Sequence, residues 1–263
     1  MATPNAQIRP YKLKDEKVVK FAIGKAPMEG LTVANRRAVF HPFTLSIWVA
    51  LSCIMIQYFG WWPNPEHGFW RFFSTVPAFA CWAVPILALI DWINRPYFED
   101  ATSDALHGLD VVNIGEYYAR SPSSGFFVLE YDGSIIGLIA IDASKDSQSN
   151  QSFKENDKVK GQKRGTSSVA MIRHFYVEEL FRKTDVQDDL VTFAVRHAFD
   201  SSEEVKEIRV VTSSLLGYVQ ESLGKIRFKV NGITRIKGVY SWTTGTMSLK
   251  RTDWTKEKPT STH

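Results

Sequence analysis

Two long uncharged stretches constrain this chain more than any other feature of its sequence. Residues 43–62 and 72–90 carry no charged side chain, and a short break of sequence PNPEHG, residues 63–68, lies between them. Each stretch has about the 20 residues that an α-helix needs to cross a bilayer. Two helices buried in a soluble domain are the alternative, but such long apolar runs rarely lie side by side in soluble proteins. We therefore predict a transmembrane helical hairpin at residues 42–95.

The rest of the chain has the composition of one soluble domain. Apolar residues make up 44% of the 263 residues, which argues against a polytopic transporter or channel. The chain has room for the hairpin plus one domain of about 150 residues, which is enough for a core. The net charge of +4 is concentrated near the N-terminus, without a basic stripe carrying interleaved aromatic residues, so we expect no nucleic-acid partner. Cys53 and Cys81 lie one in each stretch, which predicts neither a metal site nor a disulfide framework.

The charges that flank the stretches predict how the chain is oriented. Residues 1–41 read as a basic arm ending in Arg36-Arg37, whereas the connection between the spans carries Arg71 alone. The positive-inside rule then places the N-terminus in the cytosol, and two spans return the C-terminus there. The first 20 residues are too polar for a cleavable signal, so we expect the first span to direct the chain to the endoplasmic reticulum membrane. The sequon at Asn150 should accordingly stay unmodified.

Beyond Pro96 the pattern predicts an α+β domain at residues 97–251. Asp132-Gly133 is a strong hairpin signal between strands expected at 125–131 and 134–141. Further strands are expected at 168–177, 208–212 and 240–250, and helices at 188–199 and 215–223. Residues 144–166 are polar and aperiodic, which indicates a surface insertion, and residues 252–263 form a tail.

Three segments of this domain resemble the GNAT acetyltransferase superfamily, in particular its membrane-anchored members with an N-terminal transmembrane hairpin. Residues 126–137 (FFVLEYDGSIIG) resemble the family's first hairpin, and residues 172–177 (IRHFYV) resemble its central strand. Residues 208–212 (IRVVT), followed by a helix and Gly224, resemble its fifth strand and the next helix. The resemblance implies a mixed central sheet flanked by helices and, in an active member, acetyl-CoA as the cofactor.

The cofactor loop that the resemblance implies has lost its glycines here. The family binds the pyrophosphate on backbone amides at a helix N-terminus, where glycines let the phosphate approach. Lys183 and Asp185 stand at the glycine positions, and Asp188 and Asp189 add carboxylates that read as helix caps. We therefore predict a degenerate acetyl-CoA loop and no tightly bound cofactor. The matching positions are Val177, Arg182, Lys183, Thr184, Asp185, Val186 and Gln187.

The matches to the family's catalytic residues are equally weak. Gln220 stands where the family often has its tyrosine general acid, and Tyr218 lies two residues away, on another side of a helix. Glu178 and Glu179 follow the central strand, where a base could lie. We expect no catalytic residue, with Glu178, Glu179 and Tyr218 as the candidates if the domain is active. The histidine of the central strand, His174, reads as a core or edge residue.

Two functions remain open from the sequence. The first is a non-catalytic accessory protein, a pseudoenzyme of the endoplasmic reticulum membrane. The layout resembles the fungal chaperones of that membrane that help phosphate permeases leave for the cell surface; the matching features are the basic arm, Asn35-Arg36-Arg37, His41-Pro42, two spans and a cytosolic domain. That resemblance implies a polytopic partner bound through the hairpin, at Pro77, Pro85 and the tryptophans. The second is an active membrane-bound N-acetyltransferase that acetylates a lysine, a protein N-terminus or a small amine.

Overall fold

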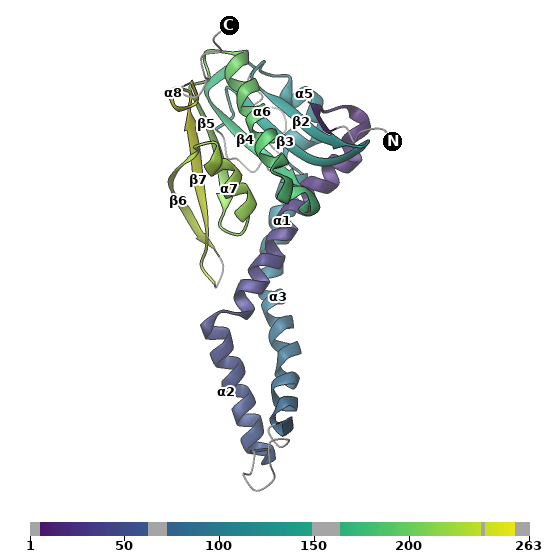
Figure 1. Cartoon of the computed structure of the whole chain (residues 1–263), viewed down its shortest axis with the longest axis vertical. Helices are drawn as coiled ribbons and strands as arrows, with labels where there is room; N and C mark the ends of the chain where they lie inside the picture. The colour runs from purple at the N-terminus through teal and green to yellow at the C-terminus, as the bar shows by residue number, and fades with distance from the viewer. Residues whose placement is uncertain (1–5, 63–72, 149–163, 238–239, 256–263) are drawn as a thin grey trace. The chain divides into compact units, whose positions relative to one another are not determined.

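The chain divides into two compact units, and one is inserted into the sequence of the other. The structure is a computed structural model that describes residues 6–62, 73–148, 164–237 and 240–255 (Figure 1). The sheet unit comprises Met1–Pro27, Ala101–Lys237 and Ser241–His263, and the hairpin unit comprises Met28–Asp100 and Gly238–Tyr240. The predicted division into a separate arm at 1–41 and a domain starting at 97 is therefore wrong, because the first 27 residues belong to the sheet unit. The break at 63–68, Arg71, the sequon at Asn150 and most of the insertion and tail lie outside the described residues.

A seven-stranded mixed sheet forms the sheet unit. The strands are β1 (Ala6–Pro10), β2 (Gly125–Tyr131), β3 (Ser134–Ser144), β4 (Thr166–Val177), β5 (Glu207–Ser213), β6 (Lys229–Lys237) and β7 (Trp242–Lys250). Their order across the sheet is β1-β2-β3-β4-β5-β7-β6. β4 and β5 pair in parallel, and the other neighbouring pairs are antiparallel. The predicted α+β class with a mixed central sheet is confirmed.

The hairpin of β2 and β3 turns at the dipeptide that the sequence indicated. Asp132 and Gly133 both have positive φ, 48° and 76°, as a two-residue turn matched to the twist of the strands requires. Tyr131 pairs with Ser134 directly across this turn. Leu129 and Ile139, on opposite strands, then both point into the main core.

Two strands were missing from the sequence prediction. β1 lies at the sheet edge and pairs with β2, Ile8 opposite Leu129. It is five residues long and contains Arg9 and Pro10, so no alternation of apolar residues marks it. β6, at the other edge, is interrupted by register shifts near Gly232 and is rich in basic residues, which is typical of edge strands.

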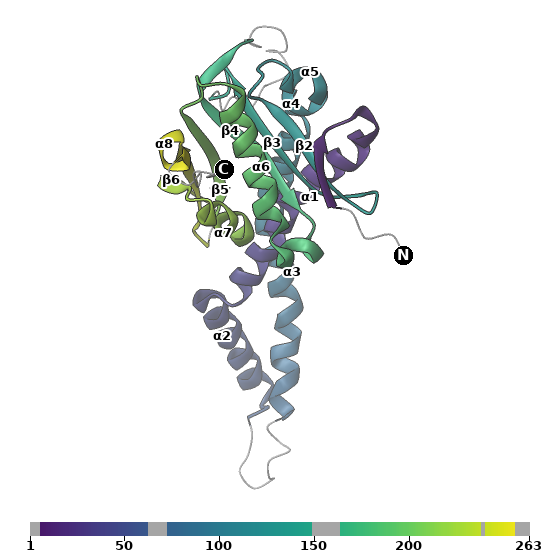
Figure 2. The same cartoon turned by 45° about the horizontal axis from the view of Figure 1, so that its top comes forward.

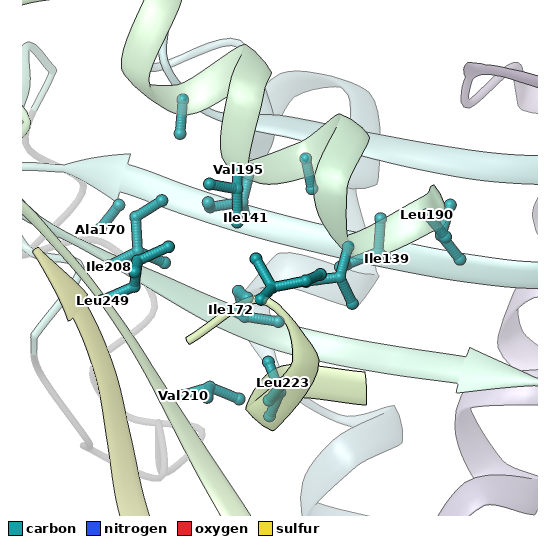
Figure 3. Close-up of a cluster of buried hydrophobic side chains, with 14 of the residues drawn as sticks. Ile139, Ile141, Ala170, Ile172, Leu190, Val195, Ile208, Val210, Leu223 and Leu249 are labelled. Carbon is teal, nitrogen blue, oxygen red and sulfur yellow. The ribbon is translucent and has the colours of Figure 1, made fainter. Parts of the chain in front are cut away.

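The main core lies between the sheet and two helices, α6 (Val186–Ser201) and α7 (Gly217–Lys225). Buried residues recur along α6 every three or four positions, which turns one face of this helix towards the strands. In Figure 3, Leu190 and Val195 of α6 lie above Ile139 and Ile141 of β3. Figure 2 shows α6 lying across these strands.

A second core covers the opposite face of β2, β3 and β4. It contains the start of α1 (Glu16–Val39) and the short helices α4 (Leu109–Val112) and α5 (Ile114–Tyr118). Val19 and Ile23 of α1 are buried with Val128 and Leu138 of the sheet. The interpretation of the first 25 residues as a solvated charged arm is therefore wrong. Their apolar residues have helical spacing, but the many lysines between them make this periodicity hard to recognise in the sequence.

The hairpin unit contains α2 (Pro42–Phe59) and most of α3 (Val76–Leu106). Residues Pro42–Phe59 and Phe73–Leu106 are each long and apolar enough to cross a membrane, by length and composition alone. Ser52 of α2 and Ala78 of α3 are completely buried. The indole Nε1 of Trp48 donates a hydrogen bond of 2.9 Å to the carbonyl of Phe79. The two helices therefore pack through one side of α2 and leave other large apolar side chains exposed.

Polar side chains join α3 to the end of α1 within this unit. Asn35 donates to Asp91 at 2.8 Å and accepts from Asn94 at 2.9 Å. Arg95 also donates a hydrogen bond of 2.8 Å to Asp91. α3 does not end near residue 90 but continues through Pro96, because these contacts and the close approach of Phe98 to Gly30 hold it against α1. Asn35 of the Asn35-Arg36-Arg37 motif thus has a structural role.

Candidate functional site

The segment that the resemblance assigns to acetyl-CoA lies between the end of β4 and the start of α6. A short helix, η5 (Glu179–Thr184), follows Val177 and Glu178. Asp185 then adopts a left-handed conformation, φ 56°, and α6 begins at Val186. Aspartate tolerates this conformation better than most residues. The chain therefore makes the turn into α6 without glycine.

Carboxylates and one ammonium group occupy the N-terminus of α6. Nζ of Lys225, on α7, lies 2.7 Å from Oδ1 of Asp185 and 2.9 Å from Oδ2 of Asp188. The hydrogen bonds to Asp185 and Asp188 raise the pKa of Lys225. Asp189 is exposed in the same first turn. Acidic side chains suit the positive end of the helix dipole, so this end is already neutralised by the protein itself.

Arg182 and Tyr218 fill the region between the end of β4 and α7. β4 pairs with β5 from Val169 to Ile172 and then continues without that partner to Val177. Nε of Arg182 donates to the carbonyl of Val177 at 2.8 Å, and its guanidinium carbon lies 3.9 Å from the centre of the Tyr218 ring. Gln187 in turn donates to the carbonyl of Arg182 at 2.9 Å, which fixes the loop.

The candidate base Glu178 is held in an ion pair. Its Oε1 lies 2.6 Å from Nζ of Lys25, and its Oε2 accepts a hydrogen bond of 2.9 Å from the hydroxyl of Tyr176. The hydrogen bond from Lys25, with smaller help from Tyr176, lowers the pKa of Glu178. A lower pKa makes a weaker base. Glu179, the second candidate, is exposed at the start of η5.

The residue at the position where the resemblance expects a general acid, Gln220, makes a weak polar contact. Gln220, on α7, points its Nε2 to Oγ1 of Thr212 on β5 at 3.4 Å. Tyr218, two residues earlier, contacts Arg182 and lies with its ring centre 6.2 Å from that of Phe175. Of the predicted site residues, the structure therefore brings Tyr218 together with Arg182, and Glu178 together with Lys25.

A buried charged cluster, which the sequence did not indicate, lies on the other face of the sheet. Asp142, at the centre, accepts hydrogen bonds from Arg173 at 2.8 Å and from the hydroxyl of Tyr117 at 3.0 Å. Arg120 is buried beside it and bonds Asp146 at 2.9 Å. Opposite charges thus meet in a buried place, where each neutralises the other. These residues are scattered along the sequence and form no local motif, so no signal was there to find.

His174 of β4 belongs to the same face. Its Nε2 lies 2.6 Å from Oδ2 of Asp110, and that carboxylate also accepts from the hydroxyl of Tyr118 at 3.0 Å. Burial opposes ionisation of Asp110, but the hydrogen bond with His174, the charge of Arg173 and the hydrogen bond from Tyr118 outweigh it and lower the pKa of Asp110. His174 is thus a largely buried strand residue with a carboxylate partner. Within the described residues, no group of three or more His, Cys, Asp or Glu side chains could hold a metal ion.

No protein-family model and no curated protein matches the chain. It is similar to a GNAT-family acetyltransferase from Staphylococcus aureus Mu50, with 9% identity, a TM-score of 0.46, and 94% of this chain and 99% of that chain covered. An N-acetyltransferase from the same organism gives 12% identity and a TM-score of 0.42, covering 94% and 98%. A GNAT-family acetyltransferase from Streptococcus pneumoniae gives 11% and 0.41, covering 53% and 73%.

Proposed function

We propose that this chain is a non-catalytic accessory protein of the endoplasmic reticulum membrane. In this proposal its acetyltransferase-like domain binds no acetyl-CoA, and its hairpin binds a polytopic transporter, such as a phosphate permease, whose assembly or exit it assists. The observation that carries the proposal is the pair of aspartates, Asp185 and Asp188, joined to Lys225 at the N-terminus of α6.

A pyrophosphate needs free backbone amides and a positive field at such a helix end. Here the ligand would meet two carboxylates, each repelling a phosphate charge by about 1 kcal/mol even in water at 4 Å. It would also have to displace the ammonium group of Lys225 from both partners. In addition, Cβ atoms at Lys183 and Asp185 stand where the resemblance requires glycine. All three effects act against binding.

Two of the three catalytic candidates, Glu178 and Tyr218, are engaged in the fold. Glu178 has a lowered pKa in its ion pair with Lys25, and the face of the Tyr218 ring is covered by Arg182. These contacts give both residues a structural use. They support a domain that acts by binding through its surfaces and not through a reaction centre.

The hairpin unit offers the surface for a membrane partner. Three large apolar side chains on its helices are strongly exposed, Ile54 at 65%, Val84 at 71% and Trp92 at 73%. Pro77 and Pro85 are exposed on α3. Transmembrane helices associate by close packing, and such surfaces face lipid or another helix. A polytopic protein supplies the helices that the proposal requires.

Calorimetric titration of the full chain in lipid nanodiscs with acetyl-CoA tests the loss of the cofactor. We expect no saturable binding up to about 1 mM, an affinity near −4 kcal/mol. A micromolar dissociation constant, or transfer of the acetyl group to an amine, would favour the active N-acetyltransferase instead. The matched variant Lys183→Gly/Asp185→Gly restores both glycines, and binding gained by it alone would identify the loop as the cause.

A separate experiment addresses the partner. The full chain is purified in mild detergent from cells that contain a tagged phosphate permease, and recovery of the permease is measured against an unrelated polytopic protein. Specific recovery supports the proposal, and equal recovery of both contradicts it. Glycosidase treatment of the same material reports on Asn150, which we expect to be unmodified.

A further inference from the structure

A group of exposed apolar and basic side chains lies at the start of α1, on the sheet unit. Leu13 is 79% exposed, Val18 48% and Phe21 72%. Lys12, Lys14 and Lys17 are exposed beside them. We call these six residues the basic–apolar patch. All three apolar side chains of the patch are therefore accessible to solvent.

Helical spacing places the patch on one side of the segment. η1 (Leu13–Asp15) leads directly into α1, and residues 13, 17 and 21, like residues 14, 18 and 21, are three or four positions apart. The other side of the helix carries Val19 and Ile23, which are buried in the second core. The core therefore holds this helix in place while the patch faces outward.

The lysines of the patch keep their positive charge uncompensated by neighbouring acids. Asp15 is bound by Arg9 at 2.6 Å, and Glu16 is bound by Lys20 at 2.6 Å. No ion pair involves Lys12, Lys14 or Lys17 within the part of the chain that the structure describes. The patch thus combines three positive charges with three exposed apolar side chains along one short segment.

We propose that the basic–apolar patch binds the headgroup layer of an anionic membrane. Exposed Leu and Phe side chains enter the boundary between headgroups and acyl chains, while lysines reach the lipid phosphates. A bound peptide would call for a concave apolar groove instead. The proposal rests on the hairpin spanning a membrane, as the proposed function requires, because the chain is then tethered to a lipid bilayer.

Spin labels on the full chain test this contact. The free cysteines Cys53 and Cys81 are replaced by serine, and a nitroxide is attached at Phe21→Cys. The chain is placed in nanodiscs of pure phosphatidylcholine or of phosphatidylcholine with phosphatidylserine. We expect the label to lose access to a water-soluble nickel complex and gain access to oxygen in the anionic discs. Replacing Lys12, Lys14 and Lys17 by Gln should abolish this shift.

Two control positions make the outcomes distinct. Val112→Cys lies on α4 of the same unit, is 65% exposed and should stay accessible to nickel in both discs. Val84→Cys lies on α3 and should report the hydrocarbon core in both. If the Val84 label is buried in lipid and the Phe21 label stays in water, the patch proposal is overturned and the hairpin stands. If the Val84 label is in water, the hairpin has failed too.

An acidic protein surface is the competing occupant. An acidic peptide, such as poly-glutamate, can be added to both kinds of disc. If the Phe21 label is shielded only when the peptide is present, and equally in neutral and anionic discs, the membrane proposal is overturned. A shift that follows the phosphatidylserine content and falls as salt rises supports it, since surface charges are screened over about 10 Å at 0.1 M salt.

Discussion

Lys25 of α1 and Glu178 at the end of β4 form an ion pair of 2.6 Å across 153 residues of sequence. Lys25 lies before the inserted hairpin unit, and Glu178 lies far behind it. The hydroxyl of Tyr176 bonds the same carboxylate. A residue that sequence reasoning offered as a catalytic base therefore helps to hold the first helix onto the sheet.

Replacing Glu178 by Gln should have a small effect on stability. The two side chains are 32% and 38% exposed, so solvent screens the pair, and we expect a loss of about 0.2–1 kcal/mol in the free energy of unfolding. Urea unfolding of the full chain in detergent, followed by circular dichroism, measures it. Glu203→Gln, at an exposed position, is the control and should be neutral. A loss of several kcal/mol would contradict this assignment.

The start of α1 should behave as core. Ile23 is 2% exposed, so Ile23→Ala should cost about 2–5 kcal/mol, whereas Val18→Ala, at a 48% exposed position of the same helix, should stay within about 0.5 kcal/mol. The same unfolding measurement compares them. Equal effects of the two variants would mean that the segment does not pack on the sheet as described.

Asp15 should make stability depend on pH in the acid range. The hydrogen bond from Arg9, aided by the backbone amide of Lys12, lowers the pKa of Asp15 in the folded chain. Its contribution is complete above roughly pH 5, beyond the unfolded value of about 3.9, and is lost as pH falls through the lowered folded pKa. Asp15→Asn should lower the free energy of unfolding by about 1.5–3 kcal/mol at pH 7. It should also reduce the fall of this free energy as the pH drops below about 5. An unchanged fall would refute the role of this carboxylate.

Arg120 should be essential to the buried charged cluster. Its side chain is 3% exposed between Asp142 and Asp146, and Arg120→Met would leave these carboxylates short of positive charge. We expect a loss of about 3–5 kcal/mol. Arg196→Met removes the same charge from an exposed position of α6 and should be nearly neutral. Comparable melting temperatures for the two variants would rule out a structural role of the cluster.

Substitutions on the hairpin should weaken partner recovery more than substitutions at the candidate catalytic residues Glu178 and Tyr218. Val84→Trp enlarges an exposed residue of α3, and overpacking a helix contact costs about 1–3 kcal/mol, so permease recovery should fall at least about fivefold. Glu178→Gln and Tyr218→Phe should leave recovery unchanged. The reverse order of effects would place the partner on the sheet unit instead.

The sequence predicted the elements whose signal is local. The turn at Asp132-Gly133 and the apolar face of α6 are both determined by residues within a few positions of each other, and the structure confirms them. β1 was missed because five residues with Arg9 and Pro10 show no period, and it is the pairing with β2 that makes it a strand.

At the candidate site the sequence shows which residue types are present, but it does not show which charged groups pair. Counting residues was enough to find that the loop before α6 has no glycine. The partners of its charged groups could not be counted in this way. Lys225 reaches Asp185 from 40 residues away, and Asp142 meets Arg120 from 22 residues away, because folding brings α7 and β3 to them. Such pairs depend on tertiary structure alone.

The insertion of the hairpin unit also fixes the order in which a cell can build this molecule. β1 ends at Pro10 and its partner β2 begins at Gly125, so roughly 115 residues must be translated before the two can meet. At about 5–20 residues per second this takes roughly 6–23 s. During that interval both apolar helices emerge from the ribosome. β1 still has no strand to pair with, and the buried face of α1 has no sheet to pack against. The helices of the hairpin unit are therefore synthesised first, and the sheet unit pairs β1 with β2 and packs α1 on its sheet only afterwards.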